Sequence, residues 1–100
     1  GLFIPPHLLT TYFFQSLKQV LAPGGVAYLN YIGSLDTHGT SMTGSLIKTL
    51  TAVFPNYALV PMTSTTDRKL QNIMIVVRHD DQSIVFNPET KIKNRLYSYD

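Results

Sequence analysis

A run of five consecutive apolar residues, Ile73 to Val77 (IMIVV), constrains the fold of this chain more than any other feature. Its residues are mostly β-branched, and β-branched side chains favour strands. A strand with one solvated face alternates apolar and polar residues, whereas this run does not alternate. The run therefore predicts a strand that is buried on both faces. In a chain of 100 residues, this implies a central strand with helices on either side of the sheet.

A first helix is predicted after a loop over residues 1–7, where Pro5-Pro6 forbids regular pairing. Thr10 or Thr11 is the expected N-cap, and the turn Pro23-Gly24-Gly25 ends the helix. One helical face gathers the apolar residues Leu9, Phe13, Leu17, Val20 and Leu21. Their spacing predicts an amphipathic helix of about three turns.

A second helix is predicted between two short strands, over residues 26–32 and 57–62. It begins at Thr40 or Ser41, and Pro55-Asn56 ends it. Its apolar residues follow a helical period: Leu46, Ile47, Leu50, Val53 and Phe54. Residues 63–71, a polar link without a helix, join the last two strands, so these strands are expected to run antiparallel. The elements together predict an α/β fold.

Composition limits the classes of partner and chemistry. Only 14% of the residues are charged, against about 25% in typical soluble domains, so we expect a partner chain or the rest of a longer polypeptide to cover some surface. The net charge of +2 is not gathered in one basic cluster, which argues against a nucleic-acid partner. Without cysteine, there is no disulfide or thiolate site. No run approaches the about 20 apolar residues of a membrane span, and a cytoplasmic location is expected.

Two adjoining segments carry a resemblance to a known family. The segment FFQSLKQVLAPGGVA, residues 13–27, resembles the helix, turn and strand of class I S-adenosylmethionine-dependent methyltransferases. The preceding segment IPPHLLT, residues 4–10, is similar to the corresponding run of spermidine-synthase-like proteins. The resemblance covers residues 1–79 and implies the C-terminal half of a methyltransferase-like domain. It implies a Rossmann-like sheet of parallel strands closed by an antiparallel strand, with helices on both faces. The reversed final strand would insert between the two strands before it.

Residues 80–100 are expected to form a tail, with a possible edge strand over residues 83–86 and a short helix after Pro88.

The same resemblance implies a function. The family transfers a methyl or aminopropyl group from S-adenosylmethionine or its decarboxylated form to a small-molecule acceptor. The family's glycine-rich donor loop and acidic residues lie upstream of the matching run and are absent here, so no residue of this chain is assigned to cofactor binding. The chain is expected to be inactive alone, with an N-terminal half missing. Residues 61–68 replace the family's tryptophan-containing polyamine motif, and this departure argues against polyamine synthesis.

Four residues are candidates for the substrate side: His7, Asp36, His38 and Arg68. Ligands of open α/β sheets bind beyond the carboxyl ends of the strands, where all four are expected. Asp36 and His38 form either an acid–base pair or a polar turn. Arg68 either binds an anionic group or is a solvated loop charge, and His7 either lines the substrate edge or hydrogen-bonds its loop. The catalytic residues stay unassigned, and the scattered histidines predict no metal site.

Two other hypotheses stay open. The chain could be a non-catalytic binding or assembly module that forms a homo-oligomer through an exposed sheet edge. It could also be an independent small α/β domain with an unrelated role.

Overall fold

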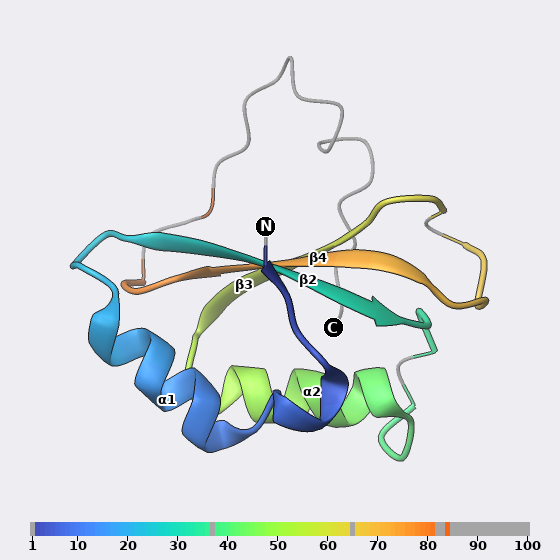
Figure 1. Cartoon of the computed structure of the whole chain (residues 1–100), viewed down its shortest axis with the longest axis horizontal. Helices are drawn as coiled ribbons and strands as arrows, with labels where there is room; N and C mark the ends of the chain where they lie inside the picture. Colours follow the sequence, from blue (N-terminus) through green and yellow to red (C-terminus); the bar gives the residue numbers. More distant parts are fainter. Residues whose placement is uncertain (1, 37, 65, 82–83, 85–100) are drawn as a thin grey trace.

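A four-stranded sheet with two helices packed against one face makes up the fold (Figure 1). The structure is a computed structural model, and it describes residues 2–36, 38–64, 66–81 and 84. Its elements in chain order are β1 (Leu2–Phe3), the 3-10 helix η1 (Pro6–Leu8), α1 (Thr11–Val20), β2 (Val26–Gly33), α2 (Met42–Thr51), β3 (Asn56–Pro61) and β4 (Gln71–Arg78). The two helices and three strands predicted over residues 9–77 are therefore present, with ends shifted by a few residues.

The apolar run lies in the central strand, as predicted. The strand order is β1-β2-β4-β3, and β4 is antiparallel to both of its neighbours. Its pairing with β2 extends from Val26 opposite Arg78 to Gly33 opposite Gln71. The antiparallel pairing of the last two long strands is confirmed, and so is the insertion of the final strand between the two before it.

The predicted Rossmann-like sheet of parallel strands is wrong. All pairing among the three long strands is antiparallel, and the only parallel pairing in the described part of the chain joins the two-residue β1 to Leu29 and Asn30. Residues 2 and 3 were expected in a loop. Alternation of helix and strand patterns along a chain identifies elements but does not say which strands pair. The reversed β4 provides a central strand without any parallel neighbour.

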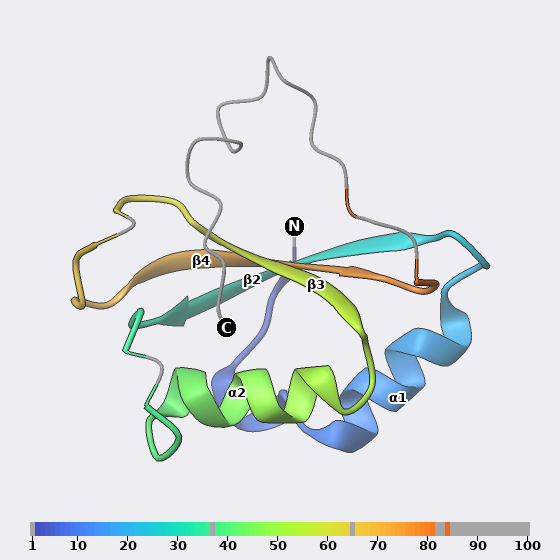
Figure 2. The ribbon, with the colours of Figure 1, turned by 180° about the vertical axis from the view of Figure 1, so that it is seen from behind.

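The prediction of helices on both faces of the sheet is also wrong. Figures 1 and 2 show α1 and α2 on the same face of the sheet. On that face, they bury Leu29, Tyr31, Ile75 and Val77. A smaller cluster occupies the opposite face and consists of Ala58, Val60 and Val76 with Val26, Met74 and Ile84 around it. Burial of β4 on both faces is thus confirmed, but an unalternating apolar run does not specify what kind of layer covers it.

The two helices begin at capping residues that the sequence predicts. The Thr10 side chain accepts a hydrogen bond from the Phe13 N–H at 3.1 Å, and that of Ser41 accepts one from the Gly44 N–H at 2.9 Å. Such bonds satisfy N–H groups that have no partner within the helix. The face of α1 differs from the prediction, because Phe14 is fully buried whereas Val20 is 79% exposed.

The Pro23-Gly24-Gly25 turn at the start of β2 is a structural turn. Gly24 has a φ of 78°, a conformation that costs little only for glycine. The Gly25 N–H donates to the Ala22 carbonyl at 2.7 Å, and the Gly25 carbonyl accepts from the His79 N–H at 3.0 Å. The turn lies at the opposite end of β2 from the loops that carry Asp36 and Arg68 (Figure 1).

The predicted tail elements, an edge strand over residues 83–86 and a helix after Pro88, fall outside the described residues apart from Ile84. Within the described ranges, no helix is both long enough and apolar enough to cross a membrane.

Candidate functional site

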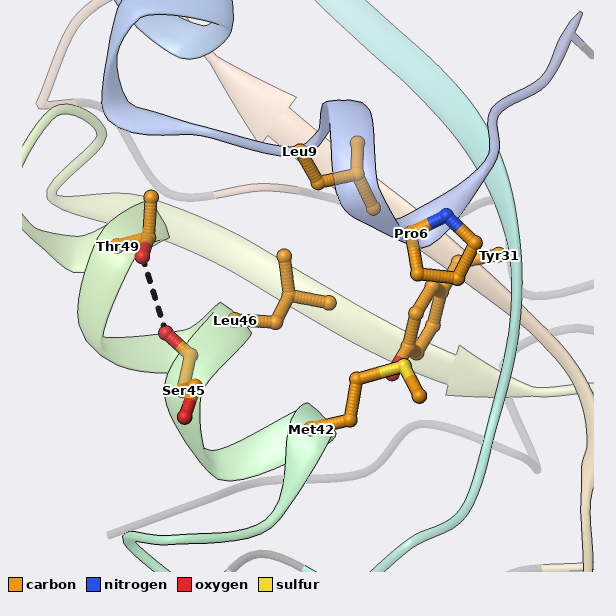
Figure 3. Close-up of a pocket in the computed structure, with 7 residues that line it drawn as sticks. All are labelled: Pro6, Leu9, Tyr31, Met42, Ser45, Leu46 and Thr49. Carbon is orange, nitrogen blue, oxygen red and sulfur yellow. Dashed lines mark hydrogen bonds between the residues drawn. The ribbon is translucent and has the colours of Figure 1, made fainter.

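A pocket of about 310 Å³ lies between the N-terminal segment and α2. Its lining comes from three parts of the chain and consists of Pro6, Leu9, Tyr31, Met42, Ser45, Leu46 and Thr49. In Figure 3, Pro6, Leu9, Met42 and Leu46 surround the opening, and the Tyr31 ring lies beside Met42. Ser45 and Thr49 stand along the helix at the side of the pocket. The lining is thus mainly apolar.

The wall of this pocket formed by Pro6 and Leu9 is fixed by backbone hydrogen bonds. The Ile4 N–H donates to the Asn30 carbonyl at 3.2 Å and ties the segment to β2. Two carbonyls, those of Pro5 and Pro6, then accept from the N–H groups of residues 8 and 9 and close the turn of η1. Pro6 suits the start of this turn because its N atom has no hydrogen to leave unpaired. These bonds fix η1 where Pro6 and Leu9 line the pocket together with residues 42–49 of α2.

Tyr31 forms the buried end of the pocket. Its side chain is fully buried, and its hydroxyl lies 3.0 Å from Oγ1 of Thr43, which is also buried. Burial raises the pKa of Tyr31 above its ordinary value, and the hydrogen bond to Thr43 opposes this only in part. The phenol therefore stays protonated at neutral pH. Tyr31 can shape the pocket and hold a hydrogen bond, but it does not act as a base.

A smaller cavity of about 140 Å³ adjoins this pocket and shares Tyr31 and Met42 with it. Ser34, Asp36 and Ser41 are among its other lining residues. Their polar groups are already used within the loop. The Ser34 hydroxyl accepts from the Asp36 N–H at 3.0 Å, and the Ser41 hydroxyl donates to the Asp36 carbonyl at 2.7 Å. The polar groups at this cavity therefore hold the loop in place.

The contact between Asp36 and His38 is that of a turn. Oδ1 of Asp36 accepts a hydrogen bond from the backbone N–H of His38 at 3.1 Å. This is the local side-chain-to-backbone bond that aspartate commonly forms two residues before its partner. Both residues are exposed. The geometry favours the interpretation of the loop as a polar turn over that of an acid–base pair.

Arg68 joins the two loops at this end of the sheet. Its guanidinium NH1 donates to the Leu35 carbonyl at 2.8 Å, and its own carbonyl accepts a hydrogen bond from the Ser34 hydroxyl. The loops after β2 and β3 therefore lie together, as the sequence predicts. His7 is exposed in η1 next to Pro6, but it is not among the lining residues of either cavity. The structure brings Asp36, His38 and Arg68 to one loop cluster and leaves His7 outside it.

The residues that shape the pocket were not singled out from the sequence. In the sequence, Tyr31 is one residue of a predicted strand and Thr43 lies near the start of a predicted helix. Met42 is an apolar residue that is exposed in the structure. The signal that could have found Tyr31 is its spacing, because it lies two residues after Leu29 and hence on the same face of β2. The described residues contain no group of three or more His, Asp or Glu side chains placed to hold a metal ion.

Comparisons of this chain with protein-family models, with curated proteins and with solved structures find no match.

Proposed function

We propose that this chain is the acceptor-side part of a spermidine-synthase-like transferase, which moves a methyl or aminopropyl group from an S-adenosylmethionine-type donor to a small molecule. In this proposal the chain neither binds the donor nor catalyses by itself, and the complete enzyme acts in the cytoplasm. The supporting observation is that Pro6 and Leu9, in the segment resembling that family, form one wall of the pocket between η1 and α2.

The chemistry of such a transfer fits a pocket that positions its ligand. A nitrogen, oxygen or sulfur atom of the acceptor attacks the carbon beside the donor's sulfonium. The new bond forms as the carbon–sulfur bond breaks, the electron pair stays on sulfur, and a proton leaves the acceptor. Tyr31 stays protonated and Asp36 does not line this pocket, so neither is placed as the base. This chain would contribute orientation of the acceptor, which is a large part of what enzymes supply.

Two measurements test this function. In calorimetry, we expect no heat of binding when the 100-residue chain is titrated with S-adenosylmethionine or its decarboxylated form, because the chain has no glycine-rich donor loop. A protein made from the same reading frame, with any coding sequence upstream of Gly1 included, should consume one of these donors. Methylthioadenosine as product identifies aminopropyl transfer, and S-adenosylhomocysteine identifies methyl transfer. Micromolar donor binding by the short chain, or no product from the longer protein, would contradict the proposal.

The outer edge of β2 favours a second candidate function, a non-catalytic module that pairs with another copy of the chain. Within the described residues, β1 covers only Leu29 and Asn30 of this eight-residue strand. On either side of that pairing, Tyr28 is 51% exposed and Ile32 is 43% exposed. An uncovered strand edge beside exposed apolar side chains is prone to pair with another strand.

Sedimentation velocity tests whether the chain is an assembly module. A module of this kind should dimerise as the protein concentration rises, and Tyr28→Lys should return it to a monomer by placing a charge at the edge. Tyr12→Lys is the matched control, because Tyr12 is 79% exposed and lies on α1, not on the strand edge. A chain that stays monomeric at high concentration, or equal loss of the dimer in both variants, argues against assembly through β2.

A further inference from the structure

The pocket between η1 and α2 carries an inference about the class of acceptor. We propose that it binds an uncharged, mainly apolar group, so that the acceptor is a neutral small molecule and not a polyamine cation. That the ligand is an acceptor rests on the proposed function. The selectivity for neutral ligands rests only on the lining of the pocket.

The described lining contains no charged side chain. Pro6, Leu9 and Leu46 provide aliphatic surface, and both leucines are buried. The Tyr31 ring adds an aromatic surface at the inner end (Figure 3). An ammonium or carboxylate that lies against these apolar groups loses part of its hydration without gaining an opposite charge, which is unfavourable. An apolar group gains free energy by leaving water.

The polar atoms at the pocket do not compensate for a charge. The Tyr31 hydroxyl is paired with Thr43, and the Thr49 hydroxyl donates to the Ser45 carbonyl at 3.0 Å (Figure 3). Asp36 does not line this pocket but the adjoining smaller cavity, where its carboxylate accepts a hydrogen bond from the His38 N–H. The Ser45 hydroxyl remains, on an exposed residue at the side of the pocket. One hydroxyl can meet a neutral polar atom but does not replace the hydration of an ion.

The volume of the pocket sets the size of the ligand. A water molecule occupies about 30 Å³ in the liquid, so the pocket of about 310 Å³ accommodates on the order of ten non-hydrogen atoms. It lies at the lower end of the range of small-molecule sites. Benzyl alcohol fits within this size, and its close analogues benzylammonium and benzoate carry a positive and a negative charge on nearly the same shape. These three compounds isolate the effect of charge.

An NMR titration of the 100-residue chain tests the inference. We expect benzyl alcohol to shift the methyl signals of Leu9, Met42 and Leu46 and to bind at least about tenfold more tightly than either charged analogue, since burying an unpaired charge is unfavourable. Benzylammonium binding as tightly as benzyl alcohol would overturn the proposal. Shifts that map outside these three residues would overturn it as well.

A pair of tryptophan variants on α2 keeps the test specific. Met42 is 57% exposed and lines the pocket, so Met42→Trp should fold and fill the space, with at least a tenfold loss of benzyl alcohol affinity. Lys48→Trp is the control, because Lys48 is exposed on the same helix and outside the lining. Amide spectra establish that both variants fold. Equal affinity in the two variants would overturn the proposal.

The failures of the two proposals are distinguishable. If the longer protein releases no transfer product, the proposed function fails, yet the preference for benzyl alcohol over its charged analogues still holds. If benzylammonium binds more tightly, the neutral-acceptor inference fails, yet the longer protein can still transfer a group to a cationic acceptor.

Discussion

Replacing Phe14 by alanine is expected to remove about 3–5 kcal/mol from the free energy of unfolding, the usual loss for a buried phenylalanine. Phe14 is fully buried on α1. Its ring meets Phe13 edge to face at 5.4 Å between centroids, and it meets Phe54, just after α2, at 6.3 Å. The substitution therefore removes the aromatic contact between α1 and the segment that follows α2. Because small domains have only about 5–15 kcal/mol of stability, this variant should be close to unfolding.

Urea denaturation followed by circular dichroism measures the loss of stability in Phe14→Ala. The matched control is Tyr12→Ala, which removes an aromatic ring from the same helix at a position that is 79% exposed. Exposed substitutions usually change stability by less than about 0.5 kcal/mol, so the midpoint of Tyr12→Ala should stay close to that of the parent. If the two variants lost similar stability, burial of the Phe14 ring would not be what stabilises the packing of α1.

Phe14 also shows where prediction from the sequence stops. The period of apolar residues located α1, and Thr10 was one of two predicted N-caps, but the period placed Val20 in the core and omitted Phe14. Phe13 and Phe14 are adjacent, and turning the helix by one residue brings either of them onto the apolar face. The ring of Phe54 decides between them, since it lies against Phe14 from a different element. The spacing of apolar residues within one helix does not predict a contact with a distant part of the chain.

The sheet shows the same limit at a larger scale. The run in β4 correctly predicted a central strand that is buried on both faces, because burial leaves its mark on the residues of the strand itself. The sequence of the strand does not show whether a helix or another segment covers each face. Helices on both faces were expected, and instead the second face of β4 packs a cluster around Val60 and Val76. The parallel pairing failed for the same reason, because strand direction depends on how the chain returns to the sheet.

The candidate site was predictable in position but not in chemistry. Loops that follow β2 and β3 were expected at one end of the sheet, and the bonds of Arg68 to this cluster bear that out. The polar residues that looked chemical are engaged in holding the loops. Oδ1 of Asp36 accepts from the His38 backbone, and Arg68 donates to a carbonyl. The nearby pocket is formed mainly by apolar residues, which carry no functional motif in the sequence. Tyr31, which lines the pocket from β2, is one such residue.

Gly33→Ala is expected to lower stability by about 1–3 kcal/mol, the usual cost of adding a methyl group to a filled core. Gly33 does not have a positive φ, so the backbone alone would tolerate alanine. The added Cβ would overlap the Tyr31 ring at Cε2 and Cζ. That ring is fully buried and its hydroxyl is held by Thr43, so it cannot move aside freely. Glycine at position 33 is thus required by Tyr31.

Thermal or urea denaturation measures the cost of Gly33→Ala, and Gly39→Ala is the matched control. At Gly39 the added Cβ would lie 3.0 Å from Nζ of Lys48, the mobile end of an exposed side chain, so the cost should be small. A double-mutant cycle with Tyr31→Leu identifies the cause. If the clash with the ring is responsible, Gly33→Ala should cost clearly less in the Tyr31→Leu background, because the two residues are coupled. Strict additivity would contradict this explanation.

The same glycine connects the stability of the core to the pocket. A displaced Tyr31 ring changes the inner end of the pocket, because Tyr31 is part of its lining. Gly33→Ala should therefore weaken benzyl alcohol binding in the protein that remains folded, whereas Gly39→Ala should bind it like the parent chain. Gly33 itself does not line this pocket, so any loss of affinity must be transmitted through the ring. Unchanged affinity in Gly33→Ala, together with its loss of stability, would show that the position of the ring matters for packing and not for the ligand.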